Sequence, residues 1–145
     1  MVPGMVTPHK DKMLEALNNN MNEEFRAVLQ YICHRISARN EHPVLAESFK
    51  TAALDEMAHM LYFSDLITQY GGTPRFAEWK VDQSSDMQAM LEADLRLEQE
   101  ARVRYTSQLE CFKACEDVAA VLTSILADET DHEETFKRYR EHLPS

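Results

Sequence analysis

The chain has 145 residues, and its 15 basic and 25 acidic side chains give a formal net charge of −10 at pH 7. A surface with this charge repels nucleic acids and anionic membranes and attracts cations. No apolar run approaches the ~20 residues of a membrane-spanning helix. The N-terminus shows no charged region, apolar core and cleavage site of a signal peptide, so we expect a cytoplasmic protein whose three cysteines are reduced.

The composition and the apolar periodicity predict an all-α protein. Glycine and proline are scarce, with 3 and 5 residues, and this scarcity favours helices. Four segments carry inward-facing residues in steps of three and four, the spacing of helices in a bundle. We expect these helices at about 8–39, 43–70, 86–115 and 116–141, within a single domain of residues 1–145.

Local signals set the order of the helices. Pro8 suits the first position of the first helix, and Pro43 suits the first position of the second helix. Gly71 and Gly72 end the second helix. Residues 71–85 form one long connection, whereas the links within the first and second pairs of helices are short. Two hairpins joined by a long crossover between the second and third helices make a four-helix bundle with the topology of ferritin-like folds.

Each of the four inward stripes contains a glutamate near its middle: Glu24, Glu56, Glu98 and Glu129. A buried, unpaired carboxylate is costly, so four at one level require partners. The second and fourth helices both contain the motif Asp-Glu-x-x-His, which begins at Asp55 and at Asp128. The i, i+3 spacing places each glutamate and its histidine, His59 or His132, on one helix face, where both can bind one ion.

The two halves of the chain match beyond this motif. Glu24 precedes Glu56 by 32 residues, and Glu98 precedes Glu129 by 31. A tyrosine follows the first glutamate of each half by seven residues, and a phenylalanine follows each histidine by four: Tyr31, Tyr105, Phe63 and Phe136. The repeat predicts a two-fold-symmetric site in which two divalent cations balance four carboxylates. Oxygen and nitrogen ligands suit iron or manganese, and zinc is possible; the alternative is a metal-free polar core.

From about residue 12 to residue 141 the sequence resembles bacterioferritins. The resemblance is carried by the runs Asn22-Glu23-Glu24, Gln30-Tyr31, Asp55-Glu56-Met57-Ala58-His59, Asp94-Leu95-Arg96-Leu97-Glu98 and Asp128-Glu129-Thr130-Asp131-His132. It implies a ferroxidase that oxidises Fe(II) to Fe(III) with oxygen or hydrogen peroxide and then stores or detoxifies the iron. Six residues would hold two iron ions per chain: Glu24 and Glu98 as terminal ligands, Glu56 and Glu129 as bridges, and His59 and His132 with one ion each.

Met57 cannot point at the metal ions when Glu56 does, because successive helix residues are ~100° apart. It lies on an outer apolar stripe, and this stripe predicts a homodimer. The resemblance implies that Met57 ligates a b-type haem shared across the dimer axis; the alternative is a packing methionine. Only 13 residues follow His132, so the fifth helix of bacterioferritins is expected to be absent, and the size of a larger shell stays open between 24, 12 or fewer subunits.

Several other residues carry smaller expectations. Asp55 and Asp128 either hydrogen-bond the histidine of the opposite hairpin or are exposed helix-side aspartates. Tyr31 is either an electron donor or a partner of a core carboxylate. Cys111 and Cys115, one helical turn apart, have poor disulfide geometry. Four histidines match no second metal motif and are expected in solvent: His9, His34, His42 and His142. Two competing functions remain: a Dps-like or rubrerythrin-like peroxide-consuming di-metal protein, and a non-catalytic metal- or haem-binding bundle.

Overall fold

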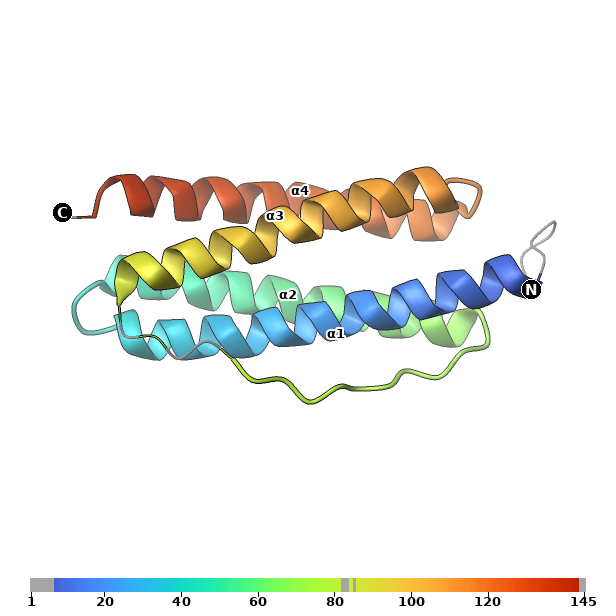
Figure 1. Ribbon diagram of the computed structural model, residues 1–145, viewed down its shortest axis with the longest axis horizontal. Helices are drawn as coiled ribbons and strands as arrows, with labels where there is room; N and C mark the ends of the chain where they lie inside the picture. The colour runs from blue at the N-terminus through green and yellow to red at the C-terminus, as the bar shows by residue number, and fades with distance from the viewer. Residues whose placement is uncertain (1–6, 82–83, 85, 144–145) are drawn as a thin grey trace.

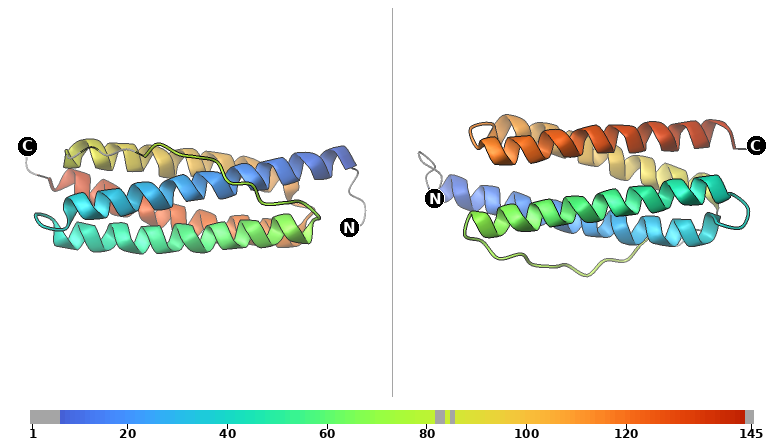
Figure 2. Two further views of the ribbon diagram at one scale, coloured as in Figure 1. Left: turned by 90° about the horizontal axis from the view of Figure 1, so that it is seen from below. Right: turned by 180° about the vertical axis from the view of Figure 1, so that it is seen from behind.

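The computed structural model describes residues 7–81, 84 and 86–143, and these contain four α-helices and no strand. The helices are α1 (Thr7–Ala38), α2 (Pro43–Gln69), α3 (Met87–Phe112) and α4 (Glu116–Glu141). α1 and α2 form one antiparallel hairpin, and α3 and α4 form a second hairpin that lies against the first (Figure 1). α1 faces α3, and α2 faces α4 (Figure 2). The predicted all-α four-helix bundle is confirmed.

The link between α2 and α3 runs back along the outside of the first hairpin, so α2 and α3 point the same way (Figure 1). Gly71, with a φ of +83°, turns the chain after α2. Gly72 then passes so close to α1 that an added Cβ would lie 2.9 Å from Cδ2 of Leu14. Both glycines are therefore required by the sharp turn that starts the crossover.

Two asparagine side chains of α1 hold this link against the hairpin. The amide of Asn18 accepts a hydrogen bond from the backbone N–H of Arg75 at 2.9 Å and donates one to the carbonyl of Thr73 at 3.3 Å. Four residues later, the amide of Asn22 accepts from the N–H of Ala77 at 2.6 Å and donates to the carbonyl of Arg75 at 2.7 Å. The two amides thus bind the extended link as a neighbouring strand would.

The limits of α3 differ from the expected ones. α3 begins after Asp86, whose side chain accepts a hydrogen bond from the N–H of Ala89 at 3.0 Å and caps the helix. It ends at Phe112, three residues early, because the N–H of Cys115 donates to the Phe112 carbonyl at 2.9 Å and closes a turn.

Cys115 is the N-cap residue of α4 and is buried, whereas Cys111 is exposed; both thiols are free. The expectation that both lie on the third helix is therefore wrong.

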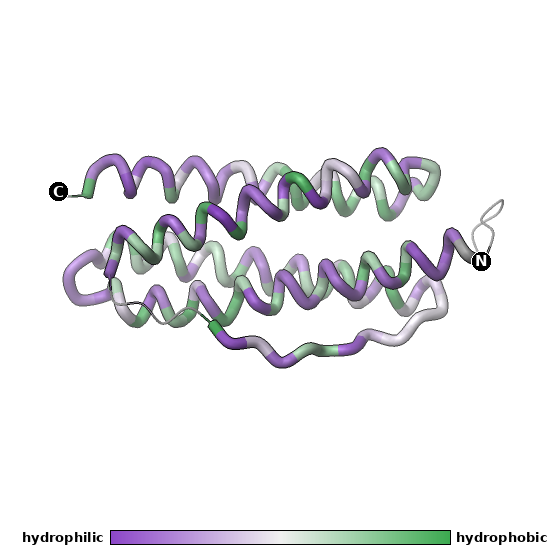
Figure 3. The backbone as a smooth tube through the Cα atoms, viewed as in Figure 1, coloured by the Kyte–Doolittle hydropathy of each residue, from purple (hydrophilic) through white to green (hydrophobic). Residues whose placement is uncertain are grey.

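Two apolar clusters fill the bundle on either side of a polar layer. One joins the first half of α1 to the ends of α2 and α3 and the start of α4: Met13, Leu17, Phe63, Ile67, Tyr105, Val118 and Leu122. The other lies towards the opposite end: Tyr31, Leu45, Phe49, Leu91, Leu95 and Phe136. Hydrophobic and hydrophilic residues alternate along all four helices (Figure 3). In the described part of the chain, no helix is both long enough and apolar enough to cross a membrane.

Replacing Asn18 by alanine is expected to lower the free energy of unfolding by about 1 kcal/mol, because the link loses two hydrogen bonds to a buried amide. Asn19→Ala is the matched control, since Asn19 lies on the same helix with an exposed side chain and gains the same helix propensity. Urea unfolding measures both variants. Equal stability of the two would show that Asn18 does not hold the link.

Candidate metal centre

The six residues expected at the metal site lie together in the polar layer between the two apolar clusters. Each helix contributes one glutamate, and α2 and α4 each add a histidine. All six side chains are buried, with exposed fractions between 1% and 7%: Glu24, Glu56, His59, Glu98, Glu129 and His132. The four helices therefore bring together, at one level, every residue that the sequence placed in the site.

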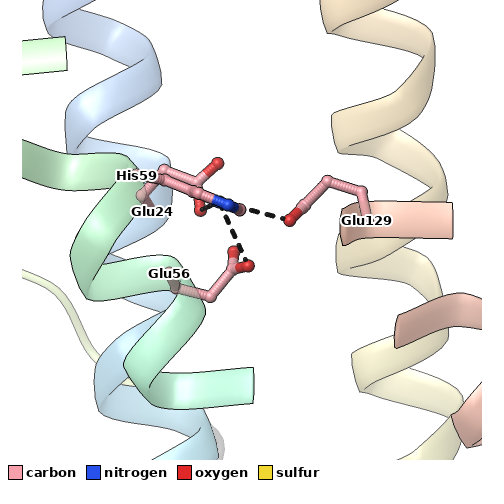
Figure 4. A group of neighbouring side chains, drawn as sticks. All are labelled: Glu24, Glu56, His59 and Glu129. Carbon is pink, nitrogen blue, oxygen red and sulfur yellow. Dashed lines mark ion pairs between the residues drawn. The ribbon is translucent and has the colours of Figure 1, made fainter. Parts of the chain in front are cut away.

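The six residues form two overlapping groups of four. Glu24, Glu56, His59 and Glu129 form one group, and Glu56, Glu98, Glu129 and His132 form the other. Within each group, one possible ligand atom from every residue lies within 4.8 Å of the others. Figure 4 shows the first group, in which glutamates of α1, α2 and α4 surround the ring of His59. Because Glu56 and Glu129 belong to both groups, the arrangement offers two candidate metal positions with two shared carboxylates.

The atoms that face the centre of each group are too far apart for good hydrogen bonds. Nδ1 of His59 is 3.5 Å from Glu24 Oε2, 3.4 Å from Glu56 Oε1 and 3.5 Å from Glu129 Oε1. Nδ1 of His132 is 3.3 Å from oxygens of Glu56 and Glu98 and 3.7 Å from Glu129 Oε1. Such spacing leaves room for an ion that contacts several of these atoms at once.

Each of the six side chains has one buried polar atom that has no hydrogen-bond partner among the described residues. These atoms are Glu24 Oε2, Glu56 Oε1, His59 Nδ1, Glu98 Oε2, Glu129 Oε1 and His132 Nδ1. Buried polar atoms are rarely left unpaired, because the loss of water is costly. Six of them in one cluster, four carboxylate oxygens and two imidazole nitrogens, make a donor set that suits iron, manganese or zinc. The residues present therefore fit two divalent metal ions.

The other ring nitrogen of each histidine is bound by an aspartate of the opposite hairpin. Nε2 of His59 lies 2.8 Å from Oδ2 of Asp128, and Nε2 of His132 lies 2.8 Å from Oδ2 of Asp55. Of the two alternatives for these aspartates, the hydrogen bond to the opposite histidine is confirmed. With Nε2 held by the aspartate, Nδ1 of each ring is the nitrogen that faces the carboxylates and that a metal ion can bind.

Two buried tyrosines repeat the same crossed arrangement. The hydroxyl of Tyr31 on α1 donates to Glu98 on α3, and the hydroxyl of Tyr105 on α3 donates to Glu24 on α1. Burial raises the pKa of both phenols well above the ordinary value, and neighbouring carboxylates raise it further. Both hydroxyls therefore stay protonated and act as donors, and each leaves the second oxygen of its glutamate without a hydrogen-bond partner among the described residues.

The carboxylates influence one another strongly. Burial raises the pKa of Glu56 and of Glu129 well above the ordinary value, and the charges of Glu24 and Glu98 raise it further. Like charges at such short range in a poorly solvated site resist joint ionisation. Glu24 behaves differently: burial alone would raise its pKa, but its polar contacts with Glu56 and His59 lower it. The raised pKa values therefore favour the protonated form of the two shared glutamates in the apo-protein.

The two imidazoles are the positive partners of these carboxylates. Burial opposes their charge, but the glutamates and the bonded aspartates outweigh burial and raise the pKa of His59 to about 9 and of His132 to about 10. Both rings therefore carry two protons at neutral pH in the apo-protein. A metal ion must displace one of them to bind Nδ1.

One buried polar cluster was missed by the sequence analysis. His34, expected in solvent, is fully buried, and its Nδ1 lies 2.7 Å from Oδ2 of Asp94. Gln30 donates to the other oxygen of the same carboxylate, also at 2.7 Å. The signal was present, since Asp94 stands on the inward stripe and a buried carboxylate needs partners, while Gln30 and His34 are four residues apart on one face of α1.

Met57 lies outside the centre, on the outer face of the first hairpin, with 48% of its surface exposed. It borders a groove of about 240 Å³ whose other described lining residues are Val28, Ile32, Arg35, Lys50, Ala53 and Leu54. The prediction that Met57 points away from the glutamates is therefore confirmed.

Comparison with known proteins gives a consistent result. The family model "Ferritin: Ferritin-like domain" matches residues 14–145. A bacterioferritin of Desulfovibrio desulfuricans is 29% identical over 139 residues, which cover 94% of this chain and 76% of that protein. A ferritin-like diiron-carboxylate protein from Bacillus anthracis superposes with a TM-score of 0.85 at 28% identity, over 94% of this chain and 99% of its own. The crystal structure of the D. desulfuricans bacterioferritin, described with its diiron site, superposes with a TM-score of 0.85 at 27% identity over 93% of this chain and 81% of its own.

Metal binding to the apo-protein at pH 7 is expected to release at least two protons per chain, one from each imidazole, because the histidine pKa values are about 9 and about 10. The affinity of the centre for the metal ion should rise as the pH is raised towards these values, since fewer protons must then be displaced. Calorimetric titration with Zn(II) in buffers of different ionisation enthalpy measures the release. A binding heat that does not depend on the buffer would contradict the charged state of the two rings.

Proposed function

The chain belongs to the ferritin-like domain family, and on that basis we propose that it is a ferroxidase that oxidises Fe(II) to Fe(III) with oxygen or peroxide and stores or detoxifies the product. The family match and the carboxylate–histidine groups fit a ferritin-like di-iron protein. The named diiron sites of two relatives at 27–28% identity support iron as the metal ion.

The observation that carries this proposal is the set of six buried, unpaired atoms that converge in two groups with two shared carboxylates. In the proposed centre Glu24 and His59 hold one Fe(II), Glu98 and His132 hold the other, and Glu56 and Glu129 bridge both. Four carboxylates balance the charge of two Fe(II) ions, so binding removes the repulsion that raises the pKa of the bridging pair.

The chemistry requires two electrons and two protons for each oxygen molecule. Each Fe(II) gives up one electron, and dioxygen takes both electrons together with two protons to form hydrogen peroxide. With peroxide as the oxidant, the same two electrons and two protons give water. The protein orients the iron ligands: Asp128 and Asp55 hold the imidazoles, and Tyr31 and Tyr105 each hold one oxygen of Glu98 and Glu24.

We also propose that the outer face of the first hairpin forms a homodimer, from which a larger shell could be built. Several large apolar side chains on this face are 45–60% exposed: Ile32, Leu54, Met57 and Leu61. The groove beside Met57 is apolar, with Arg35 and Lys50 among its lining residues. A b-type haem ligated by Met57 from each subunit would place its ring in this groove and its propionates near the two cations. We further propose one domain over residues 1–145 and a cytoplasmic location.

The apo-protein is expected to take up two Fe(II) ions per chain and to oxidise them rapidly in air. Glu129→Gln should slow the fast phase by at least about 100-fold, because the amide removes a bridging charge from both ions and even outer-sphere changes cost 10–100-fold. Glu134→Gln, the same replacement at an exposed site on α4, is the control and should oxidise at the native rate. Stopped-flow absorbance with oxygen and peroxide electrodes gives rate and stoichiometry together. Fast oxidation retained in Glu129→Gln would refute the assignment.

Haem titration of the dimer is expected to give the spectrum of b-type haem with two thioether ligands. Met57→Leu should remove these absorption bands and leave iron oxidation intact, because residue 57 lies outside the metal centre. Met60→Leu, on the same helix, is the control and should keep the bands. Native protein that stays colourless in haem titration would leave Met57 as a packing residue.

A further inference from the structure

A small cavity between α1 and α3, here called the channel, adjoins the metal centre. All four glutamates of the centre lie at its inner end, and the small or apolar side chains of Ala27, Leu97 and Ala101 line its walls. Its free volume of about 10 Å³ holds about one water molecule. The two charged residues that complete the lining, Glu23 and Arg104, are partly exposed, unlike the glutamates, and therefore stand at the outer end.

The opposite side of the centre, between α2 and α4, offers a less direct path. A hollow of about 420 Å³ lies there, lined by Asp55, Asp131 and His132 among others, but no glutamate of the centre is among its described lining residues. The ring of His132 and Asp55, which is bonded to its Nε2, stand between this hollow and the carboxylates. A cation that arrives between α1 and α3 meets carboxylate oxygens directly, whereas one that arrives between α2 and α4 must first displace an imidazole.

Arg104 lines the channel between α1 and α3. Its guanidinium lies 5.0 Å from the centre of the Tyr105 ring, and Tyr105 in turn donates a hydrogen bond to Glu24. Its Nε is buried and has no hydrogen-bond partner in the described residues. Its contact with Tyr105, followed by charge attraction from Glu23 and Glu24, holds the guanidinium in place. The contact with Tyr105 is the directional one, so the side chain can swing out by giving up that contact.

We propose that Arg104 is a gate that limits the rate at which divalent metal ions reach the centre through the channel between α1 and α3. This inference rests on the proposed metal centre and adds a residue that controls access to it. The guanidinium fills the outer end of the channel and repels an arriving cation. The glutamates at the inner end attract both the guanidinium and the cation. As bound metal ions neutralise the glutamates, the attraction that holds Arg104 inward weakens, so uptake of the first ion eases passage of the second.

The test follows the uptake of Co(II) by stopped-flow absorbance, because Co(II) in the centre gives visible bands and needs no oxidant. Arg104→Gln removes the charge at similar length and should accelerate uptake on the order of tenfold. Arg104→Lys keeps the charge and should stay within about twofold of the native rate. Arg96→Gln, an exposed site on the same helix, makes the same change in net charge and should also leave the rate unchanged.

Equilibrium titration accompanies the kinetics and should show two Co(II) ions per chain in every variant. A rate for Arg104→Gln that equals the rates of the native protein and Arg96→Gln, or falls below them, would refute the gate and place metal uptake elsewhere. Loss of one Co(II) in Arg104→Gln would refute it as well, because Arg104 would then position Tyr105 and Glu24. Neither result bears on iron oxidation, which the Glu129→Gln experiment decides separately.

Discussion

Four carboxylates share one level of the bundle, between two apolar clusters. Removing a charged carboxylate from water is costly unless it gains a partner, and four of them together also repel one another. Every polar residue around the centre reduces one of these two costs. The tyrosines donate to one oxygen each of Glu98 and Glu24, the imidazoles supply positive charge, and the raised pKa values of the shared glutamates favour their protonated form. The unpaired atoms of the six side chains are the ones available to the proposed metal ions.

The compensating contacts also join the two hairpins. Tyr31 and Tyr105 each bond a glutamate of the other hairpin, and the histidines bond aspartates in the same crossed manner. Helices within a hairpin are held by the chain and by apolar packing, but the polar layer specifies how the hairpins fit each other. A slip of one turn between them would separate every one of these pairs. The centre therefore fixes the register of the bundle as well as supplying its chemistry.

Much of this arrangement could be predicted because it repeats in the sequence. The i, i+3 motif and the matched spacings of the two halves require only helical geometry, and they placed all six residues at one level. Other contacts that depend on tertiary distance were harder to predict. The inward position of Asp94 indicated that it needs a partner, but only the fold identifies His34 as that partner. Arg104 looks like an ordinary surface arginine until the channel between α1 and α3 is visible. The turn at Cys115 depends on how tightly α3 reverses into α4.

The centre has two chemically different sides, although its residues repeat with two-fold symmetry. The symmetry relates α1 to α3 and α2 to α4, so both histidines, carried by α2 and α4, fall on one side and both tyrosines, carried by α1 and α3, on the other. On the first side, an aspartate holds each imidazole ring at Nε2, and these hydrogen bonds make that side rigid. The second side exposes carboxylates to a channel whose only cation among the described lining residues is Arg104. A symmetric repeat thus produces a directional site, because the repeat axis exchanges the two metal positions and leaves the two sides distinct.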